Sequence, residues 1–153
     1  MSGPNIKGNP LKIFVLLLVL SYFVGEFLIP KYPLIDFINL FGFLGLIISI
    51  GIFISGFKLF KSYKEDPLPT SDTKRIIKTG IFAYTRNPIY LAFILFHLFM
   101  FLVFENVLYF ISSVGLSIWL HNWIVPAEET YLRKNFSNEY DSYMNNVNRW
   151  ILF

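Results

Sequence analysis

The chain has no cysteine and only two histidines among its 153 residues. The absence of cysteine excludes disulfide bonds, thiolate zinc sites and a cysteine nucleophile. Charge is also scarce, because 15% of the residues are charged and the formal net charge is +3. No basic stripe lies on a soluble face, which argues against nucleic-acid binding. By contrast, 55% of the residues are hydrophobic and 20% aromatic, too many for an ordinary soluble domain.

Four apolar stretches have the length of membrane spans, at residues 11–29, 34–57, 88–104 and 106–127. A bilayer core of about 30 Å needs roughly 20 helical residues, and backbone in lipid must be hydrogen-bonded within its own segment. The third stretch is short and adjoins the fourth, which predicts a tight helical hairpin. We therefore expect an all-α integral membrane helical bundle: about four transmembrane helices plus a C-terminal amphipathic helix, in a single domain over residues 1–153.

The first stretch could alternatively be a signal peptide, since Lys7 and Lys12 precede it. No small-x-small cleavage site follows it, which favours a membrane span.

The hydrophilic segment 58–87 is rich in basic residues, whereas the opposite connections hold only Lys31, Asp36 and Glu105. The positive-inside rule places this segment in the cytoplasm as a loop, and four spans then place both termini there as well. Between residues 58 and 78 its basic residues are Lys58, Lys61, Lys64, Lys74, Arg75 and Lys78.

The tail 128–153 has apolar residues at helical spacing and polar residues between them, as expected of a cytoplasmic amphipathic helix. It could lie on the membrane surface. It could instead form a lid over a site at the membrane boundary. The apolar positions are Leu132, Phe136, Tyr140, Tyr143 and Val147.

The pair Asn87-Pro88 predicts the start of the third span, because asparagine is a favoured N-cap and proline is favoured at the first helical position. Free N–H groups at a helix N-terminus attract anions, and Arg86 adds a full charge. The simpler interpretation is a capped span with a basic anchor. Gly80 similarly marks a turn that requires either positive φ or close backbone approach, unless it is an ordinary loop residue.

Four titratable residues near or within the spans have both structural and functional interpretations. Glu128 and Glu129 follow the fourth stretch directly and could stabilise a helix start or face a cationic ligand. His97 and His121 lie inside apolar stretches and could relay protons or bind metal. No other metal-ligating residues stand near them, which favours packing or interfacial roles; His121 could line the same cavity as Glu128.

The motifs "TGIFAYTRNPIYL", "EETYL" and "FSNEYDSYMNNVNRWI" together, over residues 74–151, resemble the isoprenylcysteine carboxyl methyltransferase family and the related membrane phospholipid methyltransferases. The resemblance implies an integral membrane enzyme that uses S-adenosylmethionine in a cytoplasmic pocket closed by the C-terminal region. It implies Arg86 and Glu129 as catalytic residues. The implied cofactor-binding residues are Lys74, Arg75, Ile76, Ile77, Phe82, Asn87, Pro88, Ile89, Tyr90 and Glu128.

The chemistry of these residues suits that cofactor. A helix N-terminus at Asn87 can take the carboxylate, Glu128 can pair with the ammonium, and Tyr90 or Phe82 can face the sulfonium. A carboxylate acceptor needs no general base, whereas an amine acceptor must lose a proton, for which Glu129 and His121 are the candidates.

The sequence departs from the family pattern at three positions. Ile124 stands where prenylcysteine enzymes have an arginine, Asn87 replaces histidine, and Ser137 replaces glycine. The acceptor is therefore expected to be lipophilic, either a small molecule or a lipidated substrate reached through the membrane lipid, with its headgroup chemistry open. No metal is expected. The alternatives are a sterol-reductase-like NADPH enzyme and a non-enzymatic membrane protein that retains the scaffold.

Overall fold

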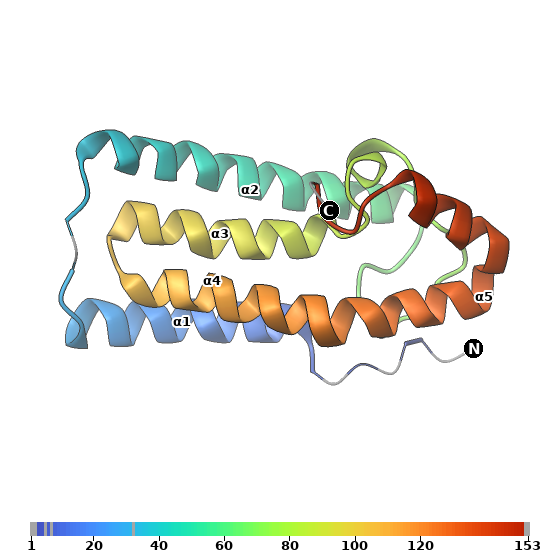
Figure 1. The fold of residues 1–153 in the computed structure, drawn as a ribbon, viewed down its shortest axis with the longest axis horizontal. Helices are drawn as coiled ribbons and strands as arrows, with labels where there is room; N and C mark the ends of the chain where they lie inside the picture. Colours follow the sequence, from blue (N-terminus) through green and yellow to red (C-terminus); the bar gives the residue numbers. More distant parts are fainter. Residues whose placement is uncertain (1–2, 5, 7, 32, 152–153) are drawn as a thin grey trace.

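The computed structural model describes residues 3–4, 6, 8–31 and 33–151, and its regular structure is helical. The long helices of the bundle lie side by side and roughly antiparallel, with a group of shorter elements and the last helix at one end (Figure 1). The helices of the bundle are α1 (Pro10–Leu28), α2 (Asp36–Ser62), α3 (Pro88–Phe104) and α4 (Val107–Trp119). The end group contains η1 (Gly80–Ala83), the π-helical turn η2 (Leu120–Ile124) and α5 (Val125–Asn146).

The layers of the bundle follow from which helices share an interface. α3 packs most extensively on α2 and next on α4, and α1 packs on α4 (Figure 1). The predicted hairpin of α3 and α4 is confirmed: Glu105 ends α3 with φ of 58°, and the Asn106 side chain accepts the Leu108 N–H at 3.0 Å. Two residues therefore suffice to reverse the chain.

α1 and α4 are joined by buried polar contacts, as helices in lipid often are. The hydroxyls of Ser21 and Ser112 lie 2.9 Å apart, and Asn106 Nδ2 donates to the Ser21 carbonyl at 3.0 Å. Gly25 permits this close approach, because a Cβ there would lie 1.8 Å from Asn106 Nδ2. The position of α1 against the hairpin is thus fixed by Ser21, Gly25, Asn106 and Ser112.

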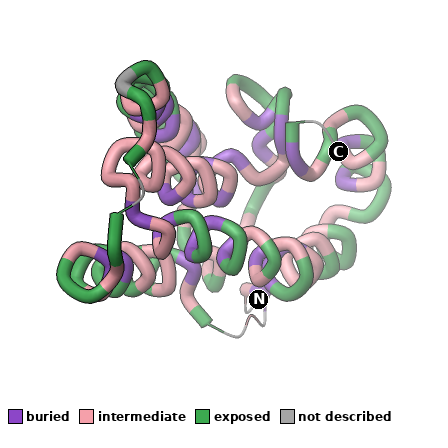
Figure 2. The backbone as a smooth tube through the Cα atoms, turned by 60° about the vertical axis from the view of Figure 1, so that its left-hand side comes forward, coloured by how far each residue is buried: buried purple, intermediate pink, exposed green. Residues whose placement is uncertain are grey.

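Many residues of the outer helices are exposed (Figure 2), and large apolar residues of α1 and α2 are among the exposed ones. Three helical segments among the described residues are long and apolar enough to cross a membrane: Pro10–Leu28, Phe37–Ser62 and Val107–Asn146. Pro88–Phe104 is a shorter apolar helix between them. The expected fold class, an all-α membrane helical bundle, is confirmed.

α2 differs in its bounds from the predicted span, since it begins at Asp36 and continues to Ser62 rather than ending at Phe57. Its last turn carries Lys61, whose positive charge stabilises the negative end of the helix dipole. The connecting loop is correspondingly shorter than the predicted segment 58–87.

The helix does not end where the fourth predicted span meets the predicted tail, at residues 127 and 128, because the chain stays helical from Val107 until the kink at Ser137. Pro126 does not start a new helix. Proline has no N–H and its ring clashes with the carbonyl four residues earlier. The π-helical turn before it shifts the hydrogen bonding by one residue, so that the Val125 N–H bonds to the Leu120 carbonyl. This turn carries the helix past the proline.

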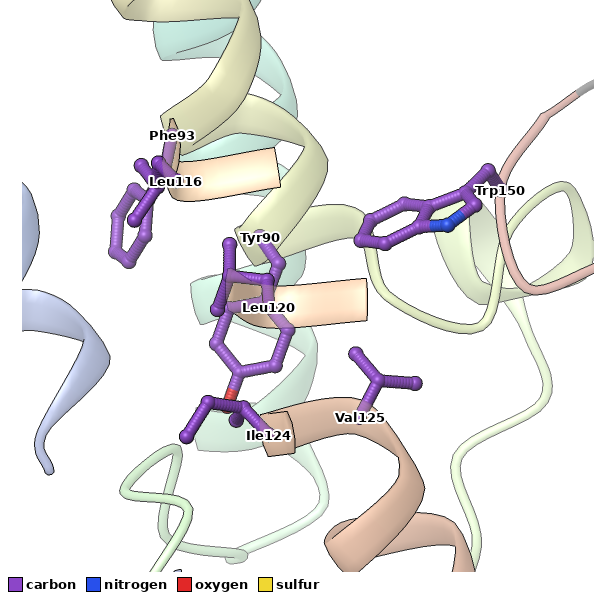
Figure 3. Packing of buried hydrophobic residues seen from close by; sticks show 7 residues of the cluster. All are labelled: Tyr90, Phe93, Leu116, Leu120, Ile124, Val125 and Trp150. Carbon is purple, nitrogen blue, oxygen red and sulfur yellow. The ribbon is translucent and has the colours of Figure 1, made fainter. Parts of the chain in front are cut away.

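α5 breaks instead at Ser137, where φ is 39° and ψ is −118°. The second half of the helix therefore folds back toward the start of α3 (Figure 1). The helix ends at Asn146, after which Val147 has extended backbone geometry, and we call residues 147–150 the closing segment. Its Trp150 enters the apolar core beside Tyr90 and Val125 (Figure 3).

Replacing Ser137 with glycine is expected to stabilise the protein by about 1 kcal/mol, because this backbone conformation strains any residue with a Cβ. Chemical unfolding in detergent measures the change. Ser142→Gly is the matched control on the same helix, at an exposed position with ordinary helical geometry. There glycine is expected to destabilise by about 1 kcal/mol. Equal signs for the two variants would contradict a strained backbone at Ser137.

Candidate functional site

A cavity lies at the end of the bundle where α2 ends and α3 begins. The loop after α2, the first turn of α3 and α5 surround it, and Pro4 from the N-terminal segment also lines it. It holds about 920 Å³ of empty space, its open mouth included. These segments are gathered at the right-hand end of Figure 1. The bundle thus ends in a hollow whose walls come from distant parts of the sequence.

The structure brings the predicted site residues together around this cavity, with one exception. Lys74 is exposed and does not line the cavity, and its backbone N–H bonds to Glu65 Oε2 at 3.0 Å. The predicted residues that line the cavity are Arg75, Ile76, Ile77, Phe82, Arg86, Asn87, Pro88, Ile89, Tyr90, Glu128 and Glu129.

Tyr90 and Glu128 form a pair across the cavity wall. The Tyr90 hydroxyl donates to Glu128 Oε1 at 2.5 Å, which joins the first turn of α3 to α5. Glu128 lies in the first turn of α5, just after the apolar residues that continue from α4. Burial raises the pKa of its carboxyl to about 8; the Tyr90 hydrogen bond opposes that rise and the Glu129 charge adds to it. Burial removes the water that would solvate the carboxylate. A cation bound beside it would therefore stabilise the charged form.

Glu129 lies between two arginines. Its Oε1 is 3.1 Å from Arg86 Nη2, and Arg149 approaches both oxygens, with Nη2 at 2.5 Å from Oε2 and Nε at 3.1 Å from Oε1. The three side chains are 9%, 12% and 24% exposed for Arg86, Glu129 and Arg149. Both carboxylate oxygens are thus engaged, and the cluster keeps a net positive charge.

Arg86 has unused hydrogen-bond donors. Its Nε and Nη1 atoms are buried and have no hydrogen-bond partner among the described residues. Buried donors without partners are rare in folded proteins and call for an explanation such as a missing ligand. Because Arg86 lies two residues before the start of α3, its side chain is close in sequence to the positive end of that helix.

Asn87 stands at the predicted N-cap position, but its side chain makes no capping hydrogen bond, so this part of the prediction is wrong. Its Nδ2 donates instead to the Arg149 carbonyl at 3.1 Å, and the Thr85 hydroxyl donates to the same carbonyl at 2.9 Å. The first N–H groups of α3 therefore remain without a side-chain cap, beside a cavity that Pro88 and Ile89 also line.

The C-terminal region covers the cavity as a lid would. The Tyr143 hydroxyl donates to the Phe82 carbonyl at 2.6 Å, and the Arg86 N–H donates to the Asn148 carbonyl at 3.0 Å. Tyr140 and Tyr143 are buried and line the cavity. Burial raises the pKa of both phenols, so they stay protonated.

Sequence reasoning did not identify the outer wall, which is the loop after α2. Pro67, Leu68 and Pro69 line the cavity from this loop. The Tyr131 hydroxyl donates to Asp72 Oδ1 at 2.7 Å, which ties the loop to α5 and lowers the pKa of the Asp72 carboxyl. The proline pair was a detectable signal, because it rigidifies a loop that would otherwise vary in shape.

The histidines lie outside this cavity. His97 is fully buried in α3 with its Nδ1 3.1 Å from the Phe93 carbonyl, which is the packing role that its sequence context favoured. His121 does not share the cavity of Glu128; it lies in η2 and lines a separate cleft. The described residues include no group of three or more histidines and acids that could hold a metal ion.

A comparison with protein families matches residues 38–139 to the phospholipid methyltransferase family. The chain belongs to this family. The matched residues run from α2 past Ser137, and so include Arg86, Tyr90 and both glutamates but not the closing segment. None of the curated proteins compared with the chain matches it. The phospholipid methyltransferase family membership and the long apolar helices make the chain a membrane protein of a methyltransferase family.

Proposed function

We propose that the protein transfers a methyl group from S-adenosylmethionine to a lipophilic acceptor in the membrane. The main support for this proposal is that one part of the cavity favours an anion and another part favours a cation. Arg86 and the uncapped start of α3 favour an anion, and Glu128 favours a cation. A ligand with both an ammonium and a carboxylate, such as the amino-acid end of S-adenosylmethionine, satisfies both.

The residues present fit the rest of that cofactor. Ile76, Ile77 and Phe82 offer an apolar wall for an adenine, and Tyr90 offers a ring face for a cationic sulfur. When bound, S-adenosylmethionine supplies an electrophilic methyl group. The protein's own task is to bind it, align it with the acceptor and exclude water.

We assign the two predicted catalytic residues different roles. Arg86 has free donors and lines the cavity, so it contacts the ligand directly. Glu129 is held by both guanidinium groups and acts as a positioning residue that fixes Arg86. A carboxylate acceptor would need no further group, and an amine acceptor would need a proton acceptor near the cavity.

We also place this end of the bundle in the cytoplasm. Lys58, Lys61 and Arg75 lie at this end, whereas the other end carries Lys31 with its partner Glu26 at 2.7 Å. The positive-inside rule favours the end with the excess of basic residues. A lipophilic acceptor would then reach the cavity from the inner leaflet.

Isothermal titration of the purified full chain tests the cofactor assignment. S-adenosylhomocysteine is expected to bind, and NADPH, the cofactor of the alternative reductase, is not. Transfer of a radiolabelled methyl group from S-adenosylmethionine to extracted lipids then identifies the acceptor. Binding of NADPH alone would overturn the methyltransferase assignment, and binding of neither would favour a non-enzymatic protein.

A further inference from the structure

Tyr140 lines the cavity from the second half of α5, beyond the kink at Ser137. The residue is only 2% exposed, and its hydroxyl makes no hydrogen bond within the part of the chain that the structure describes. Tyr143 has its ring centroid 6.1 Å away and is also buried, but its hydroxyl donates to the Phe82 carbonyl at 2.6 Å. Buried polar groups without a partner are rare in folded proteins. The Tyr140 hydroxyl therefore needs a partner that the chain itself does not supply.

The charged residues of the cavity act on this hydroxyl. Burial raises the pKa of the Tyr140 phenol, and the charges of Glu129 and Glu128 add to the rise. The charge of Arg86 opposes it. These effects place the hydroxyl within electrostatic range of the charged side chains. Because the phenol stays protonated, it can donate a hydrogen bond to an anion.

The part of the cavity that favours an anion holds other free donors. Arg86 Nε and Nη1 have no hydrogen-bond partner among the described residues, and the first N–H groups of α3 have no side-chain cap there. Glu129 does not use the Tyr140 hydroxyl, because both of its oxygens are already engaged by arginines. The two oxygens of a carboxylate accept about four hydrogen bonds. A ligand carboxylate can therefore take bonds from all three sources.

A contact with Tyr140 also connects the two halves of α5 through the ligand. Glu128 lies before the kink at Ser137, and Tyr140 lies after it. The second half of the helix folds back toward the start of α3 (Figure 1). A ligand whose ammonium pairs with Glu128 and whose carboxylate meets Tyr140 thus holds this second half over the cavity.

We propose that the Tyr140 hydroxyl donates a hydrogen bond to the carboxylate at the amino-acid end of the ligand, and so selects ligands that carry this carboxylate. The inference rests on the proposed function, because it takes S-adenosylmethionine and its product as ligands of the cavity. It adds a specificity-determining residue from the C-terminal region to the binding residues that the sequence motifs predicted.

Isothermal titration of the purified full chain with two matched ligands tests the inference. S-adenosylhomocysteine carries both an ammonium and a carboxylate, whereas its decarboxylated form keeps the ammonium and the adenosine and lacks only the carboxylate. Tyr140→Phe removes the hydroxyl alone. It is expected to weaken binding of S-adenosylhomocysteine about tenfold, because a hydrogen bond to a charged group is lost. The affinity for the decarboxylated form is expected to stay unchanged.

Tyr143→Phe is the matched control, since it removes the hydroxyl that holds the C-terminal region to the Phe82 carbonyl. This variant is expected to lower the free energy of unfolding and to weaken both ligands by the same factor. Tyr140→Phe loses no hydrogen bond of the chain and is expected to keep the wild-type free energy of unfolding. Chemical unfolding in detergent, without ligand, measures this difference.

Four outcomes would overturn the inference. An equal loss of affinity for the two ligands in Tyr140→Phe would show that the hydroxyl does not recognise the carboxylate. An unchanged affinity for S-adenosylhomocysteine in this variant would remove Tyr140 from the binding site, and equal affinity of the wild type for both ligands would remove the carboxylate site itself. If the wild type binds neither ligand, the proposed function fails and the inference fails with it. The first three outcomes leave wild-type binding of S-adenosylhomocysteine intact, so the two failures are distinguishable.

Discussion

Replacing Glu128 with glutamine is expected to weaken S-adenosylhomocysteine binding by about ten- to a hundredfold. Glutamine has nearly the same shape but cannot form an ion pair with the ligand's ammonium. Hydrogen bonds to charged groups contribute about 1.5–3 kcal/mol, and about 1.4 kcal/mol corresponds to a factor of ten in affinity. Isothermal titration at fixed pH measures the change.

The same carboxyl predicts how affinity depends on pH. The pKa of Glu128 is about 8 in the ligand-free protein, so the carboxyl is mostly protonated below that pH. Binding an ammonium requires the carboxylate, and affinity is therefore expected to fall about tenfold for each pH unit below 8. Above pH 8 the ligand's own amino group loses its proton, and affinity falls again. Titrations from pH 6 to 10 should give a bell-shaped profile with its maximum near pH 8.

Two variants separate this explanation from a general loss of structure. Glu128→Gln should lose the acidic limb of the profile, because that limb reports the titration of the Glu128 carboxyl itself. Tyr90→Phe removes only the hydroxyl that donates to Glu128 Oε1, and should keep both limbs with the acidic one displaced. An unchanged affinity and an unchanged profile in Glu128→Gln would show that Glu128 does not bind the ammonium.

Two features that shape the cavity depend on local sequence signals and were predicted: the start of α3 and the hairpin of α3 and α4. Asn87-Pro88 marks a helix start whatever the tertiary structure, and two apolar stretches that adjoin each other favour an antiparallel hairpin. That hairpin returns the chain to the level of Arg86 and so brings Glu128 to Tyr90. The spacing of the motifs therefore contained the main geometry of the site.

The remaining contacts have no local signal. The closing segment is held through backbone carbonyls of Asn148 and Arg149, and any residue type can supply a carbonyl. The same contact draws the Asn87 side chain away from its capping position. The continuity of the helix through Pro126 also escaped prediction, because it depends on a π-helical turn that composition does not reveal. His121 lies within that turn and lines a cleft separate from the cavity of Glu128.

Replacing Glu129 with glutamine is expected to destabilise the protein by about 3–5 kcal/mol. The substitution removes the only carboxylate that the structure shows within ion-pair distance of Arg86 and Arg149, and both guanidinium groups are largely buried. Leaving a buried charge without its partner carries a desolvation cost that a neutral amide offsets only in part. Chemical unfolding in detergent, followed by circular dichroism, measures the loss.

The chain offers a matched control on the same helix, where Glu139 pairs with Lys78 at 2.7 Å but both side chains are about half exposed. An exposed pair contributes little, so Glu139→Gln is expected to cost less than about 1 kcal/mol. Adding Arg149→Met to Glu129→Gln removes one of the two stranded charges and should recover part of the stability. If Glu129→Gln and Glu139→Gln cost the same, the arginine cluster would not be what holds the closing segment over the cavity. Arg86 would then owe its position to its backbone contacts alone.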